Sequence, residues 1–161
     1  MSILEKDSYR RFLSFFEING GAMGWGYVIT PETFDQIIVK NALQCAKVAL
    51  KGQAPELYGF RANPNYMTQY GYFPLHRAAE MFSVEMIELL LRNGASANLC
   101  TAGPVVIEGL LPLHVAVENT CLHKYLEDSL SHDQKHADAN YVYKLIHLLC
   151  LPELVCRTSI P

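Results

Sequence analysis

Residues 70–99, YGYFPLHRAAEMFSVEMIELLLRNGASANL, are the stretch that decides the fold. Pro74 stands where a first helix would begin, because the fixed φ of proline suits the first helical position and its missing N–H would have no partner there. After it, Leu75, Ala78 and Ala79 form a narrow apolar stripe at helical spacing. The stretch therefore opens with a short helix that buries one side.

A second helix is predicted directly after the first. It is apolar on nearly all sides, which is typical of a helix packed between neighbours. Its apolar residues are Val84, Met86, Ile87, Leu89, Leu90 and Leu91. Gly94 is expected to end this helix as a C-cap, because glycine adopts positive φ without steric cost. The two helices together make one helix-turn-helix unit.

This unit resembles the ankyrin repeat. That repeat has a period of about 33 residues and a T-P-L-H-x-A signature, and the chain carries FPLHRAA at residues 73–79. The end of the unit, GASAN at residues 94–98, is similar to the G-A-D-x-N close of the family. The resemblance implies an all-α fold, an ankyrin-repeat solenoid of helix-turn-helix units with hairpin loops.

The signature is altered at three positions. Phe73 and Leu111 replace its threonine, and the lost N-cap hydroxyl is worth about 1 kcal/mol, so packing must hold these two helices. Phe82 stands where the family has glycine between the helices. The resemblance implies that the histidine of each Pro-Leu-His motif, His76 and His114, hydrogen-bonds backbone in the neighbouring turn.

The composition is that of a globular chain. Of 161 residues, 50% are hydrophobic and 18% are charged, which argues against disorder. The net charge of −3 gives no electrostatic reason to expect nucleic acid or an anionic membrane surface as a partner, and the apolar runs are far shorter than the roughly 20 residues of a membrane helix. The five cysteines lack a C-x-x-C pair and are interpreted as reduced thiols in a cytoplasmic or nuclear protein.

A degenerate first unit is predicted before the full one. Thr30 offers a hydroxyl for an N-cap, and Pro31 follows it at the first helical position. A second helix then runs to Gly52, and the separation of Gly52 from Pro31 nearly equals that of Gly94 from Pro74. This near-equality supports a unit of the same kind.

The register of the first unit has two solutions. In the preferred one, residues 53–60 are an insertion before the closing segment at 62–65. The alternative aligns residues 62–65 with residues 95–98, one family period later, and needs no insertion. It leaves Asn-Ala-Leu, at residues 41–43, in place of Pro-Leu-His, so the first register is favoured.

A third unit begins with GLLPLHVA at residues 109–116. The separation of Pro112 from Pro74 exceeds the family period, and the excess falls in the hairpin at 101–108, where additions cost little entropy. A long polar insertion follows before the second helix resumes at Tyr141. The predicted divisions are an N-terminal capping helix and glycine-rich connector at 1–27, and an array at 28–161, with units at 28–65, 66–99 and 100–151, an insertion at 119–140, and a tail at 152–161.

The two ends of the array are interpreted differently. An amphipathic helix from Ile3 to about Ile18 is expected to cap the first unit, because solenoids expose an apolar face at each end. A partner-binding helix is the alternative. The third unit lacks the closing motif, so the chain is interpreted as C-terminally truncated. Its repeats resemble those of a group of plant ankyrin proteins of no defined activity.

The resemblance implies a non-catalytic protein–protein interaction module. In such arrays the hairpin tips and the exposed side of the first helices form a concave face, and tyrosine, arginine and methionine are enriched at interfaces. The residues predicted to bind an unidentified protein are Tyr66, Met67, Gln69, Tyr70, Tyr72, Arg77, Glu80, Met81, Val105, Val106, Ile107 and Glu108. For Tyr70 and Tyr72, packing between adjacent hairpins is the alternative.

Catalytic chemistry is not expected. The chain has no G-x-S-x-G motif and no phosphate loop, so neither a cofactor nor a small-molecule substrate is predicted. His132 and His136 are spaced for one helix face, with His123 and Asp133 nearby, but a zinc protease needs a glutamate directly after the first histidine. A solvated surface is favoured there, with a metal-dependent hydrolase as one alternative function and an adaptor or regulatory fragment of a larger protein as the other.

Overall fold

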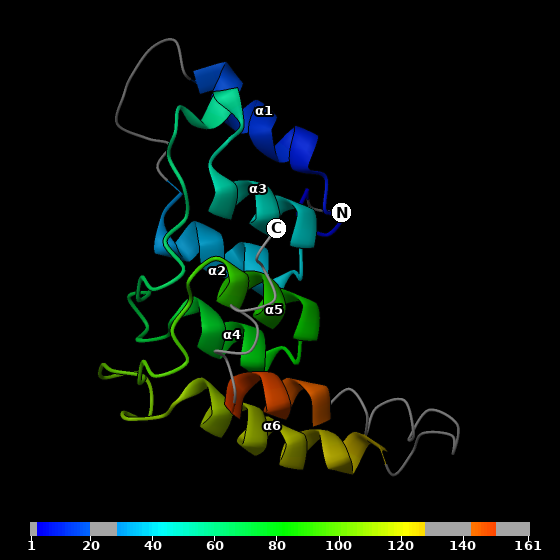
Figure 1. Ribbon diagram of the computed structural model, residues 1–161, viewed down its shortest axis with the longest axis vertical. Helices are drawn as coiled ribbons and strands as arrows, with labels where there is room; N and C mark the ends of the chain where they lie inside the picture. The colour runs from blue at the N-terminus through cyan, green and yellow to red at the C-terminus, as the bar shows by residue number, and fades with distance from the viewer. Residues whose placement is uncertain (1–2, 20–28, 128–142, 151–161) are drawn as a thin grey trace.

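The computed structural model describes residues 3–19, 29–127 and 143–150 (Figure 1). These residues form helices and connecting turns, with no β-strand among them, which confirms the helical prediction. The elements are α1 (Tyr9–Asn19), α2 (Pro31–Val39), α3 (Leu43–Lys51), the 3₁₀ turn η1 (Pro55–Leu57), α4 (Pro74–Glu80), α5 (Val84–Arg92), α6 (Pro112–Glu127) and a last helix at residues 143–150.

The helices stack in pairs. Helix α2 packs against α3 within one pair, and α4 packs against α5 within the next. Between pairs, α4 contacts both α2 and α6, and α3 contacts α5. In Figure 1 the helix at 143–150 lies beside α6, and Lys144 on it forms an ion pair with Glu88 on α5, with 2.8 Å between Nζ and Oε1.

The second pair has the helix boundaries that the sequence predicts. Helix α4 begins at Pro74 and has no side-chain cap at Phe73. Gly94 has φ of +88°, which confirms its expected conformation. Its N–H donates to Leu91 O (3.1 Å) and the N–H of Ala95 donates to Leu90 O (3.0 Å), which is the hydrogen-bond pattern of a Schellman motif.

In both units, one residue of the turn between the helices has a left-handed backbone conformation. Phe82 has φ of +53°, and Asn41 has φ of +49° at the corresponding place in the first pair. This conformation costs a residue other than glycine roughly 1–2 kcal/mol. The ring of Phe82 is half-buried and packs against the core, which offsets part of that cost.

The first pair corrects the preferred register by two positions. Helices α3 and α5 begin at Leu43 and Val84, and the buried residues of α2 and α4 repeat with the same separation as these two starts. Asp35 therefore occupies the place of His76, whereas aligning Pro31 with Pro74 would have put Thr33 there. The N-cap predicted at Thr30 is confirmed, since its Oγ1 accepts from the N–H of Thr33 at 3.2 Å.

The closing segment follows the alternative register. The side chain of Asn65 donates to Gly94 O (2.7 Å) and accepts from the N–H of Ser96 (2.8 Å), so it joins the closes of the two units. Asn65 and Asn98 are separated by one family period, while the corresponding helices of the two units lie farther apart in the sequence. The difference corresponds to residues 53–60, the insertion of the preferred register. The alternative alignment thus holds for the close, whereas the helices follow the preferred alignment shifted by two positions.

The insertion and the N-terminal helix pack together. Leu57 in η1 is buried, and η1 contacts α1, which also packs on α3. Buried Phe12 and Phe16 of α1 meet edge to face, with ring centroids 5.3 Å apart. The helix expected from Ile3 begins only at Tyr9, because residues 3–7 form turns instead.

Asp7, in those turns, caps a helix elsewhere in the chain. Its carboxylate accepts from the N–H groups of Gln44 (2.8 and 2.9 Å) and Cys45 (3.0 Å) at the start of α3. The N-cap residue of α3 is Ala42, whose side chain cannot accept a hydrogen bond. A residue distant in sequence therefore supplies the cap.

Helix α6 extends into the segment predicted as an insertion. It continues past residue 119 to Glu127, because residues 117–127 contain neither glycine nor proline to end it. The remaining part, residues 128–142, lies outside the described residues. Of the helix expected at 141–151, the structure describes residues 143–150.

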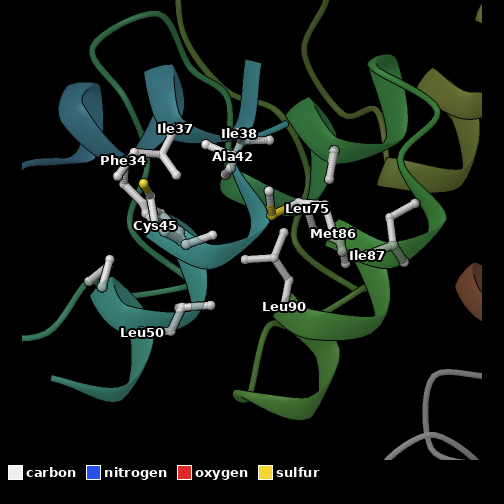
Figure 2. Close-up of a cluster of buried hydrophobic side chains, with 14 of the residues drawn as sticks. Phe34, Ile37, Ile38, Ala42, Cys45, Leu50, Leu75, Met86, Ile87 and Leu90 are labelled. Carbon is white, nitrogen blue, oxygen red and sulfur yellow. The ribbon is translucent and has the colours of Figure 1, made fainter. Parts of the chain in front are cut away.

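The core extends along the stack from Phe12 of α1 to Leu149, and Figure 2 shows the part between the first two pairs. Side chains from α2 and α3 point toward those from α4 and α5 in Figure 2, and Ile38, Leu75 and Leu90 are almost completely buried. A helix pair buries its apolar faces only when the next pair covers it. The stacking of units is thus what stabilises each of them.

Candidate functional site

Two hairpins precede the second and third helix pairs. In the first, the N–H of Thr68 donates to Tyr72 O at 2.8 Å. In the second, the N–H of Thr101 donates to Leu110 O at 2.9 Å, and the Thr101 hydroxyl bonds both the Ile107 carbonyl and the Leu110 N–H. Thr68 and Thr101 are separated by one family period, and both are buried. A buried threonine therefore closes the base of each hairpin.

The hairpins touch through their backbones. The N–H of Ala102 donates to Gly71 O at 3.3 Å. A Cβ placed on Gly71 would overlap Ala102 O and would lie 2.8 Å from Cγ2 of Val106. Gly71 also has φ of +88°. Only glycine allows both the conformation and this close approach.

The first hairpin is anchored to the helices behind it. The N–H of Gln69 donates to Glu32 Oε1 of α2 at 3.3 Å. The guanidinium of Arg77 lies over the ring of Tyr72, with 4.5 Å from Cζ to the ring centroid, a cation–π contact. These contacts hold the hairpin in one orientation against α2 and α4.

Arg77 is the centre of a charged cluster. Its Nε donates to Asp35 Oδ1 of α2 at 2.9 Å, and its Nη1 pairs with Glu80 one turn along α4. Burial acts to lower the pKa of Arg77, but the hydrogen bonds and charges of Asp35 and Glu80 more than compensate and raise it above its usual value. Arg77 is thus a permanent cation that joins the first two helix pairs.

His76 links the second helix pair to the second hairpin. It is fully buried, and its Nε2–H donates to Leu110 O at 2.8 Å, which confirms the bond implied by the resemblance. Its Nδ1 is buried without a hydrogen-bond partner. Desolvation lowers the pKa of His76, although the bond to Leu110 opposes this shift. The imidazole is therefore neutral at pH 7.

His114 does not make the implied bond to a neighbouring turn. It is exposed, and its Nδ1 accepts from the N–H of Leu111 in its own unit at 3.1 Å. The physical reason is its position: among the described residues, no hairpin of a following unit lies beyond α6 to offer a carbonyl. The two Pro-Leu-His motifs therefore have different contacts.

The structure divides the residues predicted to bind a partner into two groups. Most are exposed and lie on the hairpins or at the end of α4: Tyr66, Met67, Gln69, Tyr70, Met81, Val105, Ile107 and Glu108. Four are half-buried: Tyr72, Arg77, Glu80 and Val106. The sequence contained one indication that Arg77 forms an ion pair within the protein: an arginine three residues before a glutamate on a helix is spaced for such a pair.

The candidate site also includes residues that were not among those predicted to bind a partner. Gly71, Thr68 and Thr101 shape the hairpins, and the repetition of threonine at the family period was the signal available in the sequence. The insertion carries two exposed aromatic residues, Tyr58 (68% exposed) and Phe60 (52% exposed). Nothing in the repeat pattern pointed to them.

The histidine side chains of the alternative metal site fall outside the part of the chain that the structure describes. His132, Asp133 and His136 lie outside the described residues, as does the side chain of His123. Within the ranges that are described, no three histidine, cysteine or acidic residues gather as a group able to hold a metal ion.

The described cysteines are free thiols. Cys100 and Cys150 are exposed, whereas Cys45 is buried. Burial and a hydrogen bond with Asp7 raise the pKa of Cys45 to about 12. Because the thiolate is the reactive form, Cys45 is a poor nucleophile.

Comparison with known proteins supports the ankyrin resemblance for one unit. A family model described as Ankyrin repeat matches residues 70–102, which hold α4, α5 and the start of the second hairpin. No curated protein and no solved structure matched the chain. Along the described ranges, no helix has the length and apolar character needed to cross a membrane. The match supports an ankyrin-repeat protein, a class that typically binds proteins and is not catalytic.

Proposed function

We propose that this chain is a non-catalytic protein-binding module, built as an ankyrin solenoid, that binds a protein partner through its two hairpins and the adjacent surface of α4. The observation that carries this proposal is the exposure of apolar side chains on the neighbouring hairpins. Tyr70 is 49% exposed, and Val105 and Ile107 are 69% and 68% exposed. Exposed apolar residues that gather at one place are typical of protein interaction surfaces.

The support beneath the hairpins favours binding. The Gly71–Ala102 contact and the Arg77–Tyr72 stacking order the hairpins before a partner arrives. A surface that is already ordered loses less conformational entropy on association. In this proposal the exposed residues contact the partner, while half-buried Tyr72, Arg77, Glu80 and Val106 position them.

The proposed setting is the cytoplasm or the nucleus. The exposed thiols of Cys100 and Cys150 suit a reducing compartment, where disulfides rarely form. The partner is a protein, and we propose no cofactor or small-molecule substrate.

A photo-crosslinking experiment tests the site directly. A benzophenone amino acid replaces Tyr70 in one variant and Tyr58 in a matched control, and both proteins are irradiated in lysate of the source organism. Both tyrosines are exposed, but Tyr58 lies in the insertion rather than on a hairpin. We expect a discrete adduct from position 70 that is absent from position 58 and can be identified by mass spectrometry.

Double substitutions that introduce negative charge provide a second test of the proposed binding surface. Tyr70→Glu with Ile107→Glu should abolish capture of the cross-linked partner, whereas Tyr58→Glu with Phe60→Glu should not, because both pairs add the same charge to exposed apolar residues. Circular dichroism verifies equal helicity. Equal capture by both double variants would exclude the hairpins as the binding site.

A further inference from the structure

Among the residues that the structure describes, the cations that lack an ion pair lie in the N-terminal part of the chain. Arg77, Arg92 and Lys144 all pair with carboxylates, and Lys40 pairs with Glu5. The other cations whose side chains are described have no ion-pair partner among the described residues: Lys6, Arg10, Arg11, Lys47, Lys51 and Arg61. Within the described part of the chain, all the cations without an ion pair therefore lie between residues 6 and 61.

Two of these cations border a groove. The groove has a volume of about 280 Å³ and lies between the start of α1, the solvent face of α3 and the start of the insertion. Its lining residues are Tyr9, Gln44, Lys47, Val48, Lys51, Gln53 and Ala54. Half-buried Val48 and Ala54 give it an apolar part, and exposed Lys47 and Lys51 stand one helical turn apart.

No acidic side chain of the described residues forms an ion pair with these lysines. Both oxygens of Asp7 accept hydrogen bonds from backbone N–H groups at the start of α3. Glu5 pairs with Lys40, and one carboxylate oxygen of Glu56 is buried in the protein. Arg10 follows the groove residue Tyr9 directly in the chain and adds an exposed cation near the groove. The groove therefore presents two lysines that have no ion pair among the described residues.

The groove is smaller than the usual site for a drug-sized ligand, which has about 300–1,000 Å³. Lys47 and Lys51 are four residues apart on one helix face, so their Cβ atoms are separated by roughly 5–6 Å. That spacing allows each lysine to pair with a separate carboxylate of an extended acidic segment.

We propose that this groove binds an acidic segment of a partner protein. Carboxylates of the segment pair with Lys47 and Lys51, and an apolar side chain between them packs on Val48 and Ala54. The groove belongs to α1 and α3, whereas the binding surface proposed above belongs to the hairpins and α4. The two sites are independent, and one chain could bind two partners together.

Fluorescence anisotropy with the full chain tests this proposal. The probes are a labelled acidic peptide, EDLEDLE, and a labelled basic peptide of the same length, KKLKKLK. We expect the acidic peptide alone to bind, with an affinity that falls as salt is added because exposed charges are screened. Lys47→Glu with Lys51→Glu should weaken binding about tenfold or more, the effect of losing two exposed ion pairs.

The matched control is Arg11→Glu with Arg61→Glu. It changes the net charge equally at exposed cations that do not line the groove, and it should leave the affinity within about twofold. Equal weakening by both double variants would show a general electrostatic attraction and overturn the proposal. So would equal binding of the basic peptide, or the absence of any binding.

A membrane surface is the competing ligand. Vesicles of phosphatidylcholine with phosphatidylserine are sedimented with the wild-type chain and with both double variants. We expect no co-sedimentation that depends on Lys47 and Lys51. Vesicle binding lost with Lys47→Glu and Lys51→Glu, together with no peptide binding, would reassign the groove to anionic lipid. Thermal melts verify that each variant remains folded.

Discussion

The Cα of Gly71 faces the carbonyl oxygen of Ala102 so closely that a Cβ on Gly71 would overlap that oxygen. This contact fixes the spacing of the two hairpins on which the proposed binding surface depends. A side chain of any size at position 71 must push the hairpins apart. A substitution of Gly71 is therefore expected to affect both the stability of the protein and binding at the proposed hairpin surface.

Gly71→Ala should destabilise the protein more than Gly109→Ala. Both glycines have positive φ, +88° and +81°, and alanine in this region costs about 1–2 kcal/mol. No atom lies within 4 Å of the Cβ position at Gly109, so only Gly71→Ala adds a clash, which we expect to cost about 1–3 kcal/mol more. Urea unfolding measures both variants, and equal losses would show that the hairpins separate freely.

Asp7→Ala should lower the free energy of unfolding by about 1 kcal/mol, because it removes the cap of α3. Asp7→Asn keeps one acceptor oxygen and should fall between the wild type and Asp7→Ala. The control is Glu5→Ala, which removes the exposed pair with Lys40 and should cost less than about 0.5 kcal/mol. A cost for Asp7→Ala no greater than the control would argue against capping by Asp7.

Arg77→Met should cost about 2–3 kcal/mol, because it leaves the largely buried carboxylate of Asp35 without its cation. Adding Asp35→Asn removes the stranded charge and should recover part of the loss. Arg77→Lys should not restore stability fully, since lysine cannot bond two carboxylates and stack on Tyr72 at once. Additive effects in the Arg77→Met and Asp35→Asn cycle would exclude the coupling.

Stability should fall on mild acidification because of His76. Its pKa is lowered in the folded state, so the unfolded chain binds the proton more readily. The contribution of His76 to the free energy of unfolding is complete above its pKa in the unfolded chain, about 6.5. It is lost as the pH falls from there through the pKa of His76 in the folded state. Urea midpoints near neutral pH and at about pH 5.5 measure this loss, before most carboxylates titrate.

His76→Gln should flatten that pH dependence, since its amide can still donate to Leu110 O but does not titrate. The matched control is His114→Gln, which makes the same replacement at an exposed histidine. An unchanged slope for His76→Gln would attribute the effect of acid to other groups.

Leu90→Ala should cost about 2–5 kcal/mol, because Leu90 is fully buried between helix pairs. The same substitution at its half-buried neighbour, Leu89, should cost clearly less. Thermal unfolding with equal losses at both positions would contradict the orientation of α5 seen in Figure 2.

The helices of the second unit could be predicted because their signals are local. Pro74 sets a start and Gly94 an end within the same short stretch, and the apolar spacing between them is helical. The end of α6 could not be predicted for a related reason. No glycine or proline near Glu118 ends the helix, and it continues to Glu127.

The candidate site could be predicted only in outline. The hairpin residues Tyr70 and Ile107 were identified from their place in the repeat, and both are exposed. Arg77 was placed with them because its residue type suits an interface, yet it turns toward Asp35 on the preceding helix pair. A repeat pattern shows which side of a helix a residue occupies, but it does not show which neighbour that residue will meet.

The amino-acid sequence by itself determined where the helices of the central unit begin and end, because capping, helical spacing and glycine conformation act between residues close in the chain. Only the tertiary structure decided that Asp7 caps α3, that Gly71 meets Ala102 and that Arg77 is held by Asp35. Each of these contacts joins segments that are far apart in the sequence, so it depends on how whole units stack. Stacking is governed by the summed burial of apolar faces, which no single stretch of sequence displays.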